Sequence, residues 1–165
     1  MNSPATSTYL PPPEVNHERE GVGEELQATL HELIDLSLIG EQLHWAVVGP
    51  LFRPLHLQLD ELVDSWRELS DTVAERAVAL GFVPNGQAKA VAAGSQLAAV
   101  APTALEDYLV VRELTHRIAE VSERVRDRMD RLGDADLASQ DVLIEVVREL
   151  EKQQWMLRAQ LGEHA

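Results

Sequence analysis

The stretch His44-Trp45-Ala46-Val47-Val48-Gly49-Pro50-Leu51-Phe52 separates two long segments whose apolar residues recur every three or four positions. The glycine-proline pair inside it ends a helix, because glycine favours turns and proline lacks the amide hydrogen that a helix needs. We therefore expect one helix from about Gly23 to about Val48, followed by a tight reversal of the chain. The residues on either side of this reversal then face each other.

The remainder of the chain predicts three more long helices and one long connection. The expected helices span residues 54–81, 102–132 and 136–161. Residues 83–102, between the second and third helices, begin with a turn at Pro84-Asn85-Gly86 and continue with small apolar side chains, so we expect a short helix near Ser95–Val100. One long crossover in the middle of four helices is the ferritin-like connectivity, so the expected fold class is all-α.

Length and composition limit the domain organisation. A chain of 165 residues favours one domain, here the bundle at 23–162. Residues 1–22 predict a flexible arm, because Leu10-Pro11-Pro12-Pro13 cannot be helical, and 163–165 form a short end. The chain has no cysteine, which excludes disulfides, thiolate metal sites and thiol nucleophiles. Any metal must therefore be bound by His, Asp or Glu.

The chain shows no signal for membrane insertion or secretion. No stretch approaches the roughly 20 apolar residues of a transmembrane helix. The N-terminus also lacks a basic region followed by an apolar one. These features predict a cytoplasmic protein without a membrane partner.

Five side chains in the first two expected helices form a candidate metal constellation: His44, His56, Asp60, Asp71 and Glu75. His56 and Asp60 are four residues apart and share a helix face, as do Asp71 and Glu75. The two pairs point the same way but lie about 16 Å apart along the helix axis. One chain therefore cannot bring both pairs to one site, whereas a second copy across a two-fold axis can, making two equivalent sites. Two histidines with three carboxylates suit iron.

Two other interpretations of these residues remain open at this point. Carboxylates four residues apart are common on solvated helices, and a single histidine is more often a surface or core residue than a ligand. Glu41 with His44, and Glu113 with His116, also have the spacing of ligands inside a single di-iron bundle. Such a site would need one more carboxylate from each remaining helix, for which Asp64 and Glu145 are the candidates.

The same segments resemble the Dps family of miniferritins. His44 to Phe52 is similar to its HW-x-x-x-G-x-x-F signature, Leu55 to Asp60 to its LH-x-x-(F/L)-D segment, and Asp71 to Arg76 to its D-x-(I/V)-A-E-R segment. Glu151 to Arg158 is similar to the ending of the family's fourth helix, so the resemblance covers roughly residues 24–162. Ala46 departs from the asparagine of many members.

The resemblance implies a function and an assembly. It implies a ferroxidase that oxidises Fe(II), with hydrogen peroxide preferred over dioxygen, and stores iron in a hollow homo-dodecamer. In the family, the two histidines and the first carboxylate (here His44, His56 and Asp60) come from one subunit and the last two carboxylates (Asp71 and Glu75) from its two-fold mate. Trp45, beside a ligand, is then a candidate electron donor, whereas Trp66 is expected only to fill the core.

Acidic residues near the turn between the third and fourth helices have two interpretations. Asp136 and Asp141 are expected to line a three-fold pore that attracts Fe(II), although Asp134 or Asp136 could instead cap the fourth helix. The third helix carries a mixed set of charges, and we expect these to form a solvated face: Glu120, Glu123, Arg124, Arg126, Asp127 and Arg128.

The charge distribution predicts weak or absent DNA binding. The formal net charge is −14, and residues 1–22 contain no lysine and a single arginine, Arg19. The C-terminal residues 161–165 have no basic tail either. Non-specific DNA affinity depends on Lys and Arg that neutralise phosphates. The alternative function, a nucleoid-associated DNA-protecting protein with iron oxidation secondary, is therefore disfavoured.

Overall fold

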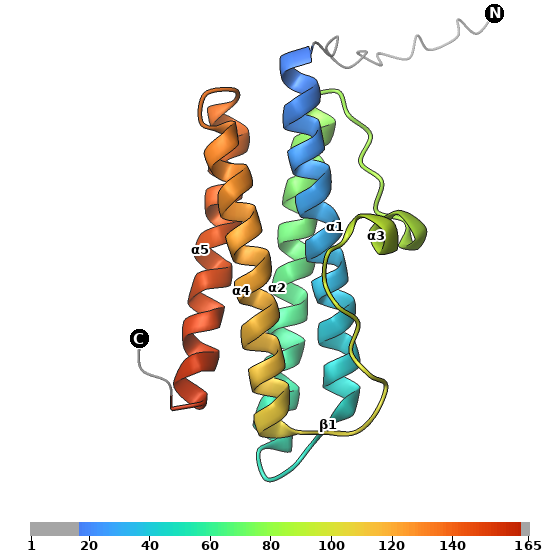
Figure 1. Ribbon diagram of the computed structural model, residues 1–165, viewed down its shortest axis with the longest axis vertical. Helices are drawn as coiled ribbons and strands as arrows, with labels where there is room; N and C mark the ends of the chain where they lie inside the picture. The colour runs from blue at the N-terminus through green and yellow to red at the C-terminus, as the bar shows by residue number, and fades with distance from the viewer. Residues whose placement is uncertain (1–16, 163–165) are drawn as a thin grey trace, which may run out of the picture.

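The computed structural model describes residues 17–162, with side chains from residue 21 onward, and these residues form a bundle of four long helices (Figure 1). The long helices are α1 (His17–Ala46), α2 (Phe52–Ala79), α4 (Asp107–Leu132) and α5 (Leu137–Gln160). A short helix, α3 (Ala88–Gly94), lies in the long crossover and packs against α1. The all-α bundle with a long crossover between its second and third long helices is thus confirmed.

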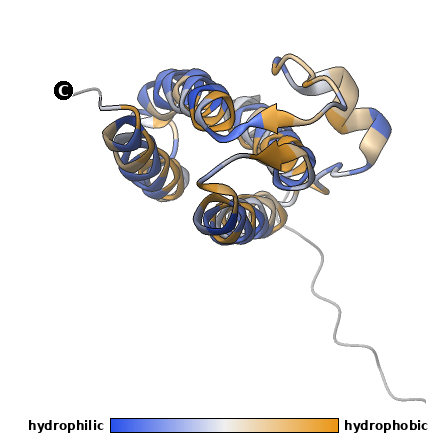
Figure 2. Ribbon diagram, turned by 90° about the horizontal axis from the view of Figure 1, so that it is seen from below, coloured by the Kyte–Doolittle hydropathy of each residue, from blue (hydrophilic) through white to orange (hydrophobic). Residues whose placement is uncertain are grey.

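Helical spacing of apolar residues places the core between the four helices. Each long helix carries both hydrophobic and hydrophilic residues around its circumference (Figure 2). The apolar residues buried along α2 recur every three or four positions: Leu55, Leu59, Leu62, Val63, Trp66, Leu69, Val73 and Ala77. Burying a leucine or valine side chain contributes roughly 1.5–3 kcal/mol, so this stripe stabilises the packing of α2 in the bundle.

Trp66 is fully buried, as expected for a core residue. Its indole Nε1 donates a 2.7 Å hydrogen bond to Oε1 of Gln153 on α5, so the polar atom of the ring is satisfied. Opposite the ring, a Cβ on Gly40 would lie 2.7 Å from Trp66 and 2.6 Å from Val63. Glycine at this position therefore lets α1 approach α2 closely around the tryptophan.

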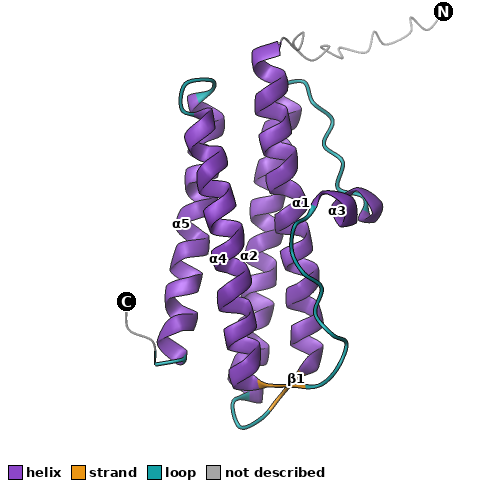
Figure 3. Ribbon diagram, in the orientation of Figure 1, coloured by secondary structure: helices purple, strands orange, loops and turns teal. Residues whose placement is uncertain are grey.

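A two-stranded parallel pairing shifts two of the expected helix ends. β1 (Val47–Val48) follows α1 and pairs with β2 (Leu105–Glu106), with Val47 opposite Leu105 and Val48 opposite Glu106. The first helix consequently ends at Ala46 and the third long helix begins at Asp107, later than expected from its sequence. Figure 3 shows this pair at the end of the bundle where α1 ends and α4 begins.

The expected position of the short crossover helix was wrong. It occupies Ala88–Gly94, whereas Ser95–Val100 has no helical assignment. The alanine-rich segment directly after the Pro84-Asn85-Gly86 turn has a high helix propensity, and buried Val91 anchors it. Ser95 then adopts extended angles (φ −75°, ψ 146°) and ends the helix.

The charged face expected on α4 is partly buried, which corrects the expectation of a solvated face. Glu32 of α1 is fully buried, and its carboxylate pairs with Arg124 and, at 2.6 Å, with Nη1 of Arg128. Arg128 itself is only 6% exposed. In the N-terminal part of α1, away from the end that leads into β1, Glu25 accepts two hydrogen bonds from Arg131, at 2.6 and 2.9 Å. These pairs tie α1 to α4.

α1 begins at His17, earlier than the expected start at Gly23. The rest of the expected arm, residues 1–16, and the C-terminal end, residues 163–165, lie outside the described residues. Within the part that is described, the helices lack the combination of length and apolar content that crossing a membrane requires.

Candidate metal centre

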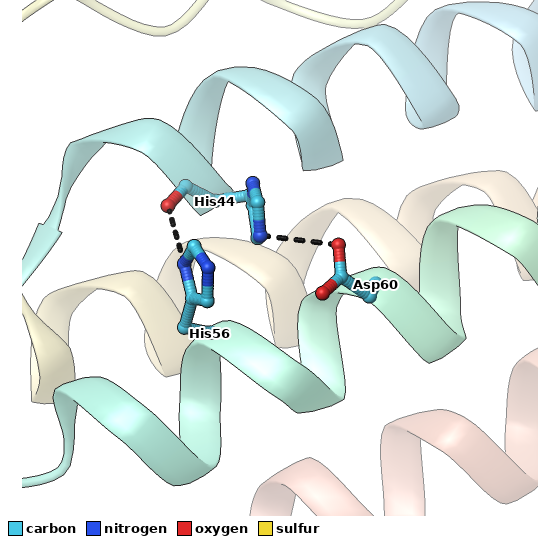
Figure 4. A group of neighbouring side chains, drawn as sticks. All are labelled: His44, His56 and Asp60. Carbon is cyan, nitrogen blue, oxygen red and sulfur yellow. Dashed lines mark hydrogen bonds and ion pairs between the residues drawn. The ribbon is translucent and has the colours of Figure 1, made fainter.

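Three of the five expected ligands meet at the end of the bundle where α1 turns into α2. His44 lies in the last turn of α1, and His56 and Asp60 lie on successive turns near the start of α2 (Figure 4). One potential ligand atom from each of the three residues lies within 4.8 Å of the others. The chain reversal at Gly49-Pro50 therefore brings residues from both helices to one site.

The two imidazole rings are stacked face to face. Their centroids are 3.7 Å apart and their planes differ by 19°. Nδ1 of His56 lies 3.2 Å from the backbone carbonyl oxygen of His44. Since a carbonyl oxygen only accepts, this hydrogen bond requires the proton on Nδ1, which leaves Nε2 of a neutral His56 ring free to bind a metal.

His44 is the least satisfied polar group of the site. Its side chain is 14% exposed, and Nε2 lies 3.1 Å from Oδ1 of Asp60. Neither ring nitrogen makes a hydrogen bond of acceptable geometry. A buried polar nitrogen without a partner is costly, so a cation shared by His44, His56 and Asp60 would satisfy it. The donor set therefore fits a metal ion such as iron.

Asp71 and Glu75 do not join this group. Both are exposed on α2, further along the helix than Asp60. This placement matches the expectation that one chain cannot bring all five ligands together. Their contribution to a metal centre depends on a second copy of the chain and stays a prediction.

The alternative site inside a single bundle does not form among the described residues. Glu41 pairs with Arg67 at 2.7 Å, and Glu113 pairs with Arg117 one helical turn away. His116 is exposed and faces Glu120 at 3.6 Å. The two extra carboxylates that such a site needs, Asp64 and Glu145, are both exposed on the surface. The geometry therefore favours the site formed by His44, His56 and Asp60.

Trp45 and the acidic residues of α5 have definite places but untested roles. Trp45 follows His44 directly, yet its side chain is 72% exposed. Asp136 is the N-cap of α5, accepting hydrogen bonds from the amides of Ala138 and Ser139. Asp141 is exposed and lines a groove between α2 and α5. Roles in a three-fold pore would require neighbouring chains and stay predictions.

Asp136 also pairs with a base across the bundle. Its Oδ2 lies 2.7 Å from Nη2 of Arg76 on α2. Partial burial raises the pKa of the Asp136 carboxyl, but the Arg76 hydrogen bond and the backbone amides of Ser139 and Ala138 outweigh it, so the pKa lies below its ordinary value. This carboxylate is therefore charged and engaged at neutral pH.

Two neighbours of the site were missed by sequence reasoning. Phe52 stacks on His56 with ring centroids 5.1 Å apart. Asp107 of α4 accepts a 2.7 Å hydrogen bond from the amide of Leu51, in the turn between the two histidine-bearing helices. The contact between Phe52 and His56 could have been predicted, because side chains four residues apart on a helix lie on the same face. No local signal exists for the second, because its partners are far apart in the sequence.

Comparisons with known proteins identify the family of this chain. Residues 23–165 match the family model of the ferritin-like domain. The chain is 37% identical to the DNA protection during starvation protein of Mycolicibacterium smegmatis over 148 residues, which cover 85% of this chain and 76% of that protein.

Solved structures give the same relationship. The tetragonal form of Mycobacterium smegmatis Dps has a TM-score of 0.87 at 34% identity, with 96% of each chain covered. Dps from Microbacterium arborescens, in its high iron form, has a TM-score of 0.85 at 29% identity, covering 92% of this chain and 99% of that chain. From the family match, the sequence identity and the shared fold together, we conclude that this chain belongs to the ferritin-like family and, within it, to the Dps group.

Proposed function

We propose that this chain is a ferroxidase that oxidises ferrous iron and stores the ferric product within a hollow assembly. The observation that carries the proposal is the half-site formed by His44, His56 and Asp60, in which both buried ring nitrogens of His44 lack a hydrogen bond and one of them faces the Asp60 carboxylate. Imidazole and carboxylate ligands together suit iron. The Dps relative from Microbacterium arborescens was solved in a high iron form, which supports iron as the substrate.

A second copy of the chain completes the centre in this proposal. Asp71 and Glu75 are exposed on the same helix that carries His56 and Asp60. A partner packed across a two-fold axis presents its own Asp71 and Glu75 to the half-site and receives the same in return. Each dimer then contains two equivalent centres with two histidines and three carboxylates each.

The proposed reaction uses hydrogen peroxide in preference to dioxygen. Peroxide accepts one electron from each of two ferrous ions and its O–O bond breaks. With two further water molecules, the products are two ferric oxyhydroxide units and four protons. His44, His56 and the carboxylates hold the ferrous ions close together, while exposed Trp45 can supply an electron when only one ferrous ion is present.

The proposed assembly is a cytoplasmic dodecamer, as the family resemblance implies. Three-fold pores lined by Asp136 and Asp141 admit Fe(II), since repeated carboxylates focus a negative potential. Of the two, Asp141 is the freer to face a pore, because Asp136 already caps α5 and pairs with Arg76.

The second candidate function, coating DNA, rests on the printed names of relatives such as the DNA protection during starvation protein. The charge of this chain opposes it. Twelve copies would each contribute a formal charge of −14, and the shell would repel phosphate backbones at long range. We therefore place iron oxidation first.

An anaerobic titration with Fe(II), followed by hydrogen peroxide, tests the proposed function. We expect ferric absorbance to appear on peroxide addition faster than in a protein-free control, in particles of roughly twelve times the 18.3 kDa chain mass. Light scattering measures the mass in the same samples. A stable monomer, or ferric absorbance no faster than without protein, would contradict the proposal.

A further inference from the structure

The relative placement of His44 and His56 depends on the short segment that joins their helices. His44 lies near the end of α1 and His56 near the start of α2, and the joining residues are β1 followed by Gly49, Pro50 and Leu51. The stacked rings tolerate little change, because Nδ1–H of His56 also donates a 3.2 Å hydrogen bond to the backbone carbonyl oxygen of His44. Whatever fixes this turn also fixes the two ligands.

One carboxylate on α4 holds the turn from outside the α1–α2 pair. Oδ2 of Asp107 accepts a 2.7 Å hydrogen bond from the amide of Leu51, and Oδ1 accepts a 2.8 Å bond from the amide of Tyr108. Leu51 is the N-cap residue of α2, and its own side chain makes no capping hydrogen bond. Asp107 therefore places one negative charge at the N-termini of both α2 and α4, where helix dipoles favour it.

The turn is shaped to receive this carboxylate. Gly49 has φ +130°, a backbone conformation that residues other than glycine rarely adopt. A Cβ at Gly49 would lie 2.5 Å from Oδ2 and 2.7 Å from Cγ of Asp107, so only glycine leaves room for the contact. The adjoining β1–β2 pairing brings the start of α4 to the turn (Figure 3).

We propose that Asp107 is a positioning residue of the metal centre, which holds the α1–α2 turn so that His44 and His56 present their nitrogens to one ion. The inference rests on the proposed function, because it assumes that these histidines bind a metal. Removing a group that orients metal ligands typically weakens metal affinity by about 10–100-fold. Among the described residues, the Asp107 carboxylate accepts hydrogen bonds from the backbone amides of Leu51 and Tyr108 and not from a ligand side chain. Its effect on the metal centre therefore passes through the turn.

The test is an equilibrium titration of the full-length assembled protein with Co(II), without oxidant, followed by d–d absorbance and calorimetry. We expect Asp107→Ala to weaken Co(II) binding by about 10–100-fold and to alter the absorption bands. Asp107→Asn keeps an oxygen that can accept the Leu51 amide, so its affinity should lie between those of wild type and Asp107→Ala. Should Asp107→Ala fail to fold, a weakened and altered Co(II) signal in Asp107→Asn supports the proposal and a wild-type signal overturns it.

Two controls separate the possible failures. Glu25→Ala removes an acid that ties α4 to α1 near the opposite end of the bundle, and it should leave the Co(II) affinity and spectrum unchanged despite a stability loss. His56→Ala removes a ligand and should abolish the bands. If His56→Ala binds Co(II) as wild type does, the metal centre itself is wrong. If His56→Ala loses the bands but Asp107→Ala matches Glu25→Ala, the centre stands and the positioning role of Asp107 is overturned.

Discussion

At the scale of single residues, the surroundings of His44 give the most direct indication of a metal site. A nearly buried imidazole that faces a carboxylate at 3.1 Å, with both nitrogens lacking a well-formed hydrogen bond, fits the proposed role of metal ligand better than that of a core residue. His56 differs because its Nδ1 is engaged with a backbone carbonyl, which fixes the nitrogen available for binding. The two histidines therefore have distinct surroundings within one site.

Replacing His44 tests this argument directly. We expect His44→Ala to lower the initial rate of peroxide-driven Fe(II) oxidation by at least about tenfold, since a lost ligand costs more than a lost orienting group. His116→Ala is the matched control, because His116 is exposed and belongs to the alternative site. Stopped-flow ferric absorbance measures both. Equal losses in the two variants would favour the alternative site and contradict the centre formed by His44, His56 and Asp60.

At the scale of secondary structure elements, helix ends show what local sequence can and cannot predict. The Gly49-Pro50 reversal and the stripe of buried leucines on α2 follow from glycine and proline chemistry and from helical spacing. The start of α4 does not, because it depends on Leu105 and Glu106 pairing with residues of β1 far earlier in the chain.

The same limit applies to charged residues and to the site. Arg124 and Arg128 were expected on a solvated face, because mixed charges on a helix do not reveal which face packs against a neighbour. Both instead pair with the buried carboxylate of Glu32. Spacing predicted that His44, His56 and Asp60 could meet, since the chain reversal brings them together locally. The hydrogen bond from the Leu51 amide to Asp107 could not be predicted, because it joins segments that are far apart in the sequence.

The N-terminus of α5 yields a prediction about pH. The pKa of Asp136 lies below its ordinary value of 3.8, so the folded state binds this proton more weakly than the unfolded state does. The stabilisation is therefore fully present above the ordinary pKa and is lost as pH falls through the lower, folded-state pKa. Asp136→Asn keeps an N-cap oxygen but loses the charged pair with Arg76, so we expect a loss of roughly 1 kcal/mol at neutral pH.

Urea unfolding of wild type and Asp136→Asn at several pH values measures this effect. The difference between their unfolding free energies should shrink as the pH falls below the ordinary carboxyl pKa. Asp134→Asn serves as the control, because Asp134 is exposed in the same turn. A difference that stays constant or grows toward acid would show that the Arg76 pair does not contribute as described.

At the scale of the whole molecule, the negative charge sets what the proposed shell can bind. A gel-shift assay with duplex DNA in EDTA, at about 0.15 M salt where the Debye length is near 8 Å, should show no retardation. EDTA removes divalent cations that could bridge the acidic shell and DNA. Stoichiometric retardation independent of sequence under these conditions would reveal a basic patch and contradict the charge argument.

The two-fold centre is the central claim, and mixed assemblies test it most directly. His56→Ala removes a ligand from one half of each centre, and Glu75→Ala removes one from the other half, so neither variant alone contains an intact centre. A dimer of one His56→Ala chain and one Glu75→Ala chain places both lesions in a single centre and leaves the other complete. Dissociating and reassembling an equal mixture should therefore restore part of the peroxide-driven Fe(II) oxidation, roughly a quarter of all centres being intact if the chains pair at random. Activity that stays at the level of the separate variants, while light scattering confirms mixed assembly, would contradict a metal centre shared between two chains.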